Sequence, residues 1–194
     1  MKLILNQQSP FSIRGDSKGI SFLFPMQTLF ERYVTKILEK NAKDNYSVEK
    51  QVRSVYLSEA PKAFLLKPDI AISQDGQVVS ILDTKWKLID QNALYDNGNE
   101  DKKANISQAD MYQMFAYGHK YLKGGKGKLV LIYPQWSNFN EMKQFDLGNG
   151  LVLYAFPFVL NEADKSALNI FELIQRGVDA ETNADGVNTG VNDS

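Results

Sequence analysis

With 194 residues, 43% of them hydrophobic and 23% charged, the chain fits one domain with a tail, and this composition excludes wholesale disorder. The lack of cysteine excludes disulfides and zinc–thiolate sites, and no run approaches the ~18 apolar residues of a membrane span. The net charge of −1 identifies no partner, although acidic residues concentrate in residues 162–194 and leave the preceding part net basic. Because Met1–Pro10 also lacks the apolar core of a signal peptide, we expect a cytoplasmic protein that does not enter a membrane.

Hydrophobic spacing predicts an α/β fold with a mixed central sheet flanked by helices. In chain order, the predicted elements are a helix over 26–40, strands over 47–57, 65–72 and 78–86, a helix over 106–122, strands over 129–133 and 151–159, and a helix over 161–176 that ends at Gly177. An Asp75-Gly76 turn joins the second and third strands, because this dipeptide tolerates the positive φ of a tight hairpin. We predict an N-terminal segment over 1–20, one domain over 21–177 and a disordered tail over 178–194.

Charged residues interrupt two of the predicted apolar strands. Asp69 follows Pro68 in one strand, and Asp83 and Lys85 lie two apart in the next, so these last two point to the same face. The Asp-Gly turn lies near the midpoint between Asp69 and Asp83, and the hairpin should therefore place the two carboxylates nearly opposite each other. Their repulsion would destabilise the sheet without a compensating cation. Lys85 supplies one positive charge, and a bound divalent metal would supply two more.

This arrangement suits metal-dependent hydrolysis of a phosphodiester. Asp69, Asp83 and the backbone carbonyl of Thr84 could form part of the shell of Mg²⁺, which prefers a few carboxylate oxygens and keeps several waters. Lys85 could orient the attacking water or stabilise charge in the transition state. A structural salt bridge from Asp69 or Asp83 to Lys85 is the alternative, and it is the commoner meaning of an isolated Asp-x-Lys. The full spacing of Pro-Asp, hairpin, Asp-x-Lys and amphipathic helix favours the metal site.

The sequence resembles restriction-endonuclease-like nucleases of the PD-(D/E)xK superfamily at Pro68-Asp69 and Asp83-Thr84-Lys85. It is similar to the RecB-like branch at the Gln-x-x-x-Tyr element over 113–117. Three segments, over 24–34, 83–87 and 110–117, look like the McrC family, the nuclease subunit of modification-dependent restriction systems.

The resemblance implies a Mg²⁺-dependent endodeoxyribonuclease, in which Mn²⁺ can substitute, with Asp69 and Asp83 as metal ligands and Lys85 as the catalytic lysine. Glu31 would be a further acid near the metal; the alternative is a solvated helix acid paired with Thr35 or Lys36. Gln113 would order the lysine or a DNA phosphate; the alternative is a surface amide.

Two further residues are candidate DNA contacts. Tyr117 lies four residues after Gln113 and therefore on the same helix face, where it can equally be a packing residue. Lys87 has the same strand parity as Asp83 and Lys85 and could lie near the DNA.

The resemblance also implies partners. McrC proteins dock through a sizeable N-terminal region onto a GTP-hydrolysing AAA+ motor of the McrB type, whereas here only about 20 residues precede the first similar segment. One active site per chain cuts one DNA strand, so double-strand cleavage requires a homodimer or sequential cuts. A RecB-like repair exonuclease and a non-catalytic DNA-binding module on the same fold are the alternative functions.

Overall fold

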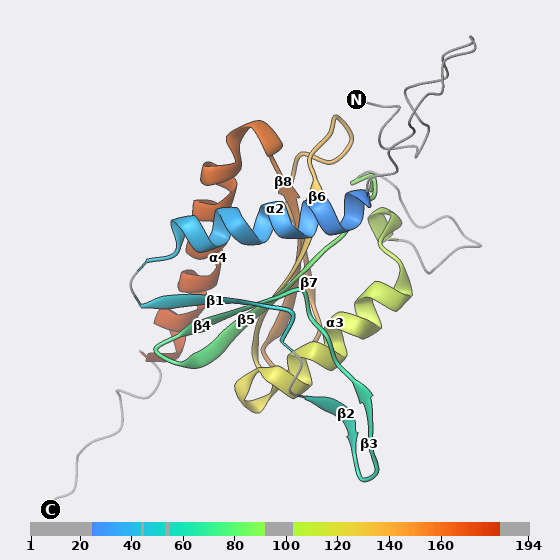
Figure 1. Cartoon of the computed structure of the whole chain (residues 1–194), viewed down its shortest axis with the longest axis vertical. Coiled ribbons are helices and arrows are strands. Elements are labelled where there is room, and N and C mark those ends of the chain that lie inside the picture. The colour runs from blue at the N-terminus through green and yellow to red at the C-terminus, as the bar shows by residue number, and fades with distance from the viewer. Residues whose placement is uncertain (1–24, 44, 53–54, 92–102, 183–194) are drawn as a thin grey trace, which may run out of the picture.

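A six-stranded sheet with helices on both faces forms the body of the molecule (Figure 1). The computed structural model describes residues 25–43, 45–52, 55–91 and 103–182. The helices are α2 (Met26–Asn41), α3 (Gln108–Tyr121) and α4 (Ala163–Thr182). The sheet contains β1 (Tyr46–Lys50), β4 (Ile70–Gln74), β5 (Gln77–Thr84), β6 (Gly127–Pro134), β7 (Lys143–Asp146) and β8 (Leu151–Phe158). A separate hairpin is formed by β2 (Tyr56–Glu59) and β3 (Lys62–Leu65), and three short 3-10 turns lie at Lys103–Asn105, Lys123–Gly125 and Leu160–Glu162.

The sheet is mixed, as the sequence predicts. Its strand order is β1-β4-β5-β6-β8-β7, in which β5 with β6 and β6 with β8 are parallel and the other neighbours are antiparallel. The predicted Asp-Gly turn joins β4 to β5, with Gln74 opposite Gln77 and positive φ angles of 50° at Asp75 and 80° at Gly76. The α/β class is therefore confirmed.

Two apolar clusters pack on opposite faces of the sheet. Helices α2 and α4 cover one face, to which Leu82 of β5 contributes, and α3 covers the other, to which the adjacent Ile81 contributes. Since neighbouring residues of a strand face opposite ways, this assignment fixes the direction of the side chains at the end of β5, beyond the register shift that the pairing of Ser73 with Val78 marks near its start. Asp83 follows Leu82 and therefore points to the α3 face.

Several predicted boundaries were wrong. The predicted strand over 47–57 is two strands in two sheets: β1 ends at Lys50, Gln51 takes a positive φ of 50°, and β2 begins at Tyr56. The predicted strand over 65–72 likewise merges the end of β3 with β4, and the hairpin and β7 were not predicted. Helix α4 begins at Ala163 and continues through Gly177 to Thr182.

The N-terminal segment over 1–20 and the part of the predicted tail beyond Thr182 lie outside the described residues. Within the described ranges, every helix is too short or too polar to cross a membrane.

Candidate active site

The candidate site residues meet where β5 ends. Asp83 is only 3% exposed, and its Oδ2 lies 2.8 Å from the ammonium nitrogen of Lys85. The register of Ile70 opposite Leu82 places Asp69 and Asp83 at the next facing position, as predicted. Oδ2 of Asp69 accepts hydrogen bonds from the backbone nitrogen of Thr84 at 2.8 Å and from its hydroxyl at 2.7 Å. Two carboxylates and one amine thus converge on one strand end.

Burial and the neighbouring Asp69 disfavour the charged form of Asp83. Burial, followed by the charge of Asp69, raises the pKa of Asp83 from 3.8 to about 6, although Lys85 acts in the opposite direction. Burial acts to lower the pKa of Lys85, but Asp83 and Asp110 outweigh it, so the net shift is upward and the side chain stays an ammonium. The single positive charge of Lys85 therefore does not balance the two facing carboxylates. A divalent cation bound between them would supply the missing positive charge.

Helix α3 orients the lysine. The Lys85 ammonium donates a 3.1 Å hydrogen bond to Oε1 of Gln113, whose Nε2 in turn donates to the Tyr117 hydroxyl at 2.8 Å. This is the shared helix face that the sequence predicts for Gln113 and Tyr117. Tyr117 is only 3% exposed, and this burial argues against the direct DNA contact expected for it. Its hydroxyl instead fixes the amide that holds Lys85.

Asp110 is a residue of the site that the sequence analysis did not single out. Its Oδ1 lies 3.4 Å from the Lys85 nitrogen, and its Oδ2 forms an ion pair with Lys87. Burial acts to raise the pKa of Asp110, but hydrogen bonds from Lys87 and Ser107 and the charge of Lys85 lower it overall. Lys87 is thus engaged with Asp110 and does not project freely toward a DNA strand. The available signal was the spacing of Asp110 three residues before Gln113, which places both on one helix face.

Gln27, at the start of α2, is a second residue of the site that the sequence analysis did not single out. Its Nε2 donates to the Thr84 carbonyl at 2.6 Å, and its Oε1 accepts from the backbone nitrogen of Trp86 at 2.7 Å. The Trp86 ring packs against Phe30 of the same helix at 5.3 Å between centroids. The backbone on both sides of Lys85 is therefore held from α2. Gln27 lies in a segment that carries the family resemblance, but its role depends on a contact 57 residues away along the chain.

Glu31 does not contact the paired carboxylates directly but is linked to Asp69 through Gln51. Its Oε1 accepts a 3.1 Å hydrogen bond from Nε2 of Gln51, and the backbone nitrogen of Gln51 donates to the Asp69 carbonyl at 2.8 Å. Thr35 bonds the Glu31 backbone carbonyl, not its carboxylate. Among the described residues, no three His, Cys, Asp or Glu side chains are grouped closely enough to hold a metal ion. The structure therefore brings Asp69 and Asp83 together without a third described acid close enough to share a metal ion with them.

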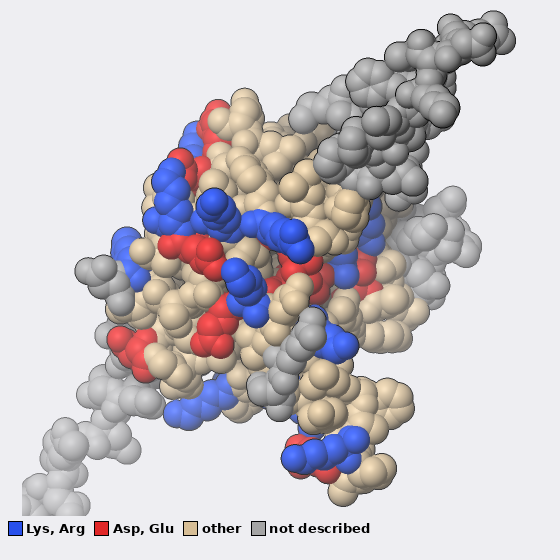
Figure 2. All heavy atoms as spheres, viewed as in Figure 1, with Lys and Arg blue, Asp and Glu red and all other residues tan. Residues whose placement is uncertain are grey.

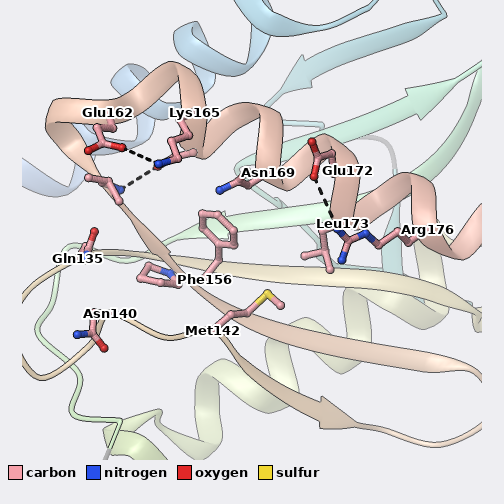
Figure 3. Close-up of a pocket in the computed structure, with 13 residues that line it drawn as sticks. Gln135, Asn140, Met142, Phe156, Glu162, Lys165, Asn169, Glu172, Leu173 and Arg176 are labelled. Carbon is pink, nitrogen blue, oxygen red and sulfur yellow. Dashed lines mark hydrogen bonds and ion pairs between the residues drawn. The ribbon is translucent and has the colours of Figure 1, made fainter.

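A cavity lies elsewhere, between α4 and β8 (Figure 3). It has a volume of about 420 Å³ and is lined by residues that include Met142, Phe156 and Asn169. Two ion pairs border it: Glu162 of the preceding 3-10 turn with Lys165 of α4 at 3.1 Å, and Glu172 with Arg176, both of α4, at 3.7 Å. The residues predicted for the site are not among those that line it, so the candidate site and this cavity are separate features.

Comparison with known proteins places the chain in a family. The sequence model of the McrBC 5-methylcytosine restriction system component family matches residues 1–134, more than half of the chain. The chain belongs to this family. The resemblance to a modification-dependent restriction system that the sequence analysis stated is thereby confirmed.

The fold of this McrBC family member is similar to that of a solved structure. It resembles a chain in a refined half-complex from a tetradecameric assembly of Thermococcus gammatolerans McrB AAA+ hexamers with bound McrC. The TM-score is 0.54 and the sequence identity 17%, and the match covers 82% of this chain and 34% of that chain. The likeness shows a shared fold, and the present chain spans about a third of the solved chain's length. No curated protein matches this sequence.

Proposed function

We propose that this chain is a metal-dependent endodeoxyribonuclease that hydrolyses DNA phosphodiesters within a modification-dependent restriction system. The observation that carries the proposal is the strand end at which Asp69 faces Asp83 and a half-buried, oriented Lys85 contacts one of the two carboxylates. Family membership supports the restriction system as the setting.

The donor set fits Mg²⁺, and Mn²⁺ should substitute for it. Mg²⁺ is held in proteins by one or two carboxylates together with waters and substrate phosphates, so a carboxylate pair without a third acid is sufficient. Asp69 and Asp83 would hold the ion, with the Thr84 carbonyl beside them; that carbonyl accepts from Gln27 but has a second lone pair. Glu31 is proposed only as an outer acid, linked through Gln51. The bound ion would lower the pKa of a water and neutralise charge on the phosphate.

The protein's own contribution is to place a charged amine. Lys85 has three acceptors around its nitrogen, namely Asp83, Asp110 and Gln113, and they fix its position at the strand end. From there the ammonium can donate to a phosphate oxygen as negative charge develops, or orient the attacking water. A purely structural salt bridge would not require Asp69 opposite Asp83, and this second acid favours the catalytic interpretation.

The partners are proposed on chemical and family grounds. Duplex DNA is the substrate, and sequence or methylation recognition comes from a GTP-hydrolysing AAA+ motor of the McrB type. A chain that resembles this one in fold occurs in a complex of McrB hexamers with McrC, which supports such an assembly.

Plasmid cleavage tests the proposal. The purified chain, with and without a McrB-type motor, is incubated with supercoiled plasmid in Mg²⁺, Mn²⁺ or EDTA. Lys85→Ala and Asp83→Ala should each reduce cleavage at least about 100-fold, because each removes a group that stabilises the transition state or holds the metal. Lys165→Ala, which removes a 73% exposed lysine on α4, is the matched control and should cleave normally. Cleavage that survives both site substitutions would exclude this active site.

The form of the DNA separates the alternatives. An endonuclease nicks circular plasmid before linear product accumulates, because each chain cuts one strand. A RecB-like exonuclease would degrade linear DNA and spare closed circles. A non-catalytic module would bind both forms and cut neither in any metal.

A further inference from the structure

The hairpin β2–β3 projects from the body as a separate two-stranded sheet beside α3 (Figure 1). Tyr56 pairs with Leu65 and Ser58 with Ala63, which sets Leu57 and Phe64 at the intervening facing positions. The base of the hairpin is fixed to α3, because the Tyr121 hydroxyl shares its one proton between the carbonyls of Val52 at 3.2 Å and Leu66 at 3.1 Å. The hairpin is therefore an anchored projection.

Two apolar side chains face solvent on this projection. Phe64 is 75% exposed and Leu57 46%, the former being the most exposed large hydrophobic residue among those described. Phe64 also has a positive φ of 59°, a backbone conformation that is unfavourable for a bulky residue. At Phe64, the exposed ring adds little burial energy to the fold and the backbone conformation lowers its stability. Strain of this kind is a feature from which a functional role can be inferred.

The hairpin belongs to the same part of the chain as the candidate active site. Its first leg follows Gln51, which bonds Glu31 and the Asp69 carbonyl, and its second leg ends shortly before Asp69. Phe64 precedes Asp69 by five residues, so their Cα atoms are at most roughly 18 Å apart. That span equals about five nucleotides along one DNA strand.

Lysines outnumber the exposed Glu59 among the described charged residues on and beside the projection. Lys62 at its tip and Lys67 on its second leg are exposed, and Lys120 of α3 pairs with Glu59 at 3.0 Å beside them. Figure 2 shows charged side chains on the projecting hairpin and mixed basic and acidic side chains across the body beneath α2. Lysines on either side of Leu57 and Phe64 can contact phosphates while these apolar side chains meet the bases.

We propose that the β2–β3 hairpin is a DNA-contacting wedge, in which Phe64, supported by Leu57, packs against or between bases next to the scissile phosphate. This inference rests on the proposed nuclease function. The hairpin would hold the duplex in register with Asp69 and Asp83 and distort it locally at the cost of some base stacking.

Fluorescence of 2-aminopurine tests the wedge, because this base brightens when it is unstacked. The full chain carrying Lys85→Ala, which should bind without cutting, is titrated onto duplexes with the probe at successive positions. We expect the fluorescence rise at positions within about five nucleotides of the scissile phosphate. Adding Phe64→Ala should abolish the rise and weaken binding about tenfold, which corresponds to the loss of one stacking contact. Phe64→Leu, which keeps an apolar side chain, should retain much of both signals.

The matched control is Leu168→Ala, which removes a side chain of 45% exposure on α4 and should change neither signal. Circular dichroism melting verifies that each variant is folded. Unchanged brightening and affinity in Phe64→Ala would overturn the wedge. A change in oligomeric state or motor binding with unchanged DNA signals would also overturn it and would assign the surface to a protein partner. In either case plasmid cleavage by the wild-type chain would leave the nuclease proposal standing, whereas a wild-type chain that neither binds nor cuts DNA would remove both.

Discussion

At the scale of single residues, the main feature is a lysine shared between three acceptors. Asp83 at 2.8 Å, Gln113 at 3.1 Å and Asp110 at 3.4 Å surround the Lys85 nitrogen. Because the acceptors come from β5 and α3, the position of the ammonium depends on how the helix docks on the sheet. Groups that act through the lysine should therefore affect turnover more than DNA binding.

Asp110→Asn should reduce turnover by roughly 10- to 100-fold, the usual effect of losing an outer-shell partner. The amide keeps the shape of the carboxylate but removes the charge that Lys85 and Lys87 share. Steady-state cleavage kinetics should show the loss in kcat with little change in KM for DNA. Gln108→Ala, an exposed position on the same helix, is the control. An equal loss in both variants, or a change in KM alone, would contradict a positioning role for Asp110.

Asp83→Asn should stabilise the metal-free protein at neutral pH. Folding raises the pKa of Asp83 from 3.8 to about 6, so the protonated form is favoured in the folded state. In the wild-type protein, protonated Asp83 stabilises the folded state. This contribution is fully present below pH 3.8 and is lost as the pH rises through about 6. Urea unfolding in EDTA should show the advantage of the variant growing by about 1–2 kcal/mol between pH 4.5 and 7.5. The same difference at both pH values would show that Asp83 ionises without cost.

The sequence predicted the residues of the site that lie close together along the chain. Asp69, Asp83 and Lys85 follow from strand alternation and one hairpin, and Gln113 with Tyr117 from one helical turn. The contacts of Gln27 and Asp110 required knowledge of how α2 and α3 dock on β5, which no local periodicity specifies. The same limit applies to Lys87, which lies beyond the end of β5 and whose pairing with Asp110 was not predicted.

At the scale of elements, the docking of α3 depends on one glycine. A Cβ at Gly118 would lie 2.7 Å from both terminal methyl groups of Leu151 and 3.2 Å from one of Leu129. Both leucines are fully buried, so they have little room to move. The helix can approach the sheet closely because this position carries no side chain.

Gly118→Val should destabilise the protein by about 1–3 kcal/mol, the usual cost of overpacking a core. Chemical unfolding measures this loss, and cleavage should fall as well because α3 carries Asp110 and Gln113 to Lys85. Ala116→Val adds the same kind of side chain at a partly exposed position of α3 and should cost less than about 1 kcal/mol. Equal losses at both positions would show that helix propensity, not close packing, explains the result.

The elements predicted best are those with a long hydrophobic pattern. Helices α2 and α3 were predicted within a few residues because their apolar residues repeat with the helical period, and strands β5, β6 and β8 because each contains a run of mostly apolar residues. The errors lie at Gln51, where the chain leaves the sheet although the alternation continues, and in the short strands β2, β3 and β7. A strand of four residues has too few positions to show a period, and its partner decides whether it forms.

At the scale of the whole molecule, the core depends on the C-terminal third. The family match ends at residue 134, yet half of the apolar cluster beneath α2 and α4 follows that point, including Phe158, Ile170 and Phe171. A chain ending at Pro134 should therefore show no cooperative thermal transition by circular dichroism. A chain ending at Thr182, which retains every described residue, should melt like the full chain. Cooperative melting of the shorter chain would show that the matched part folds by itself.

The parallel pairing of β5 with β6 has a consequence for synthesis of the protein. When translation reaches Tyr121, every residue proposed for the chemistry has been made, but β5 still lacks the neighbouring strand that follows in the chain. The edge of β5 can be covered only after β6 emerges from the ribosome, and β6 in turn pairs with the later β8. A nascent chain would thus remain catalytically silent until nearly all of it had been translated.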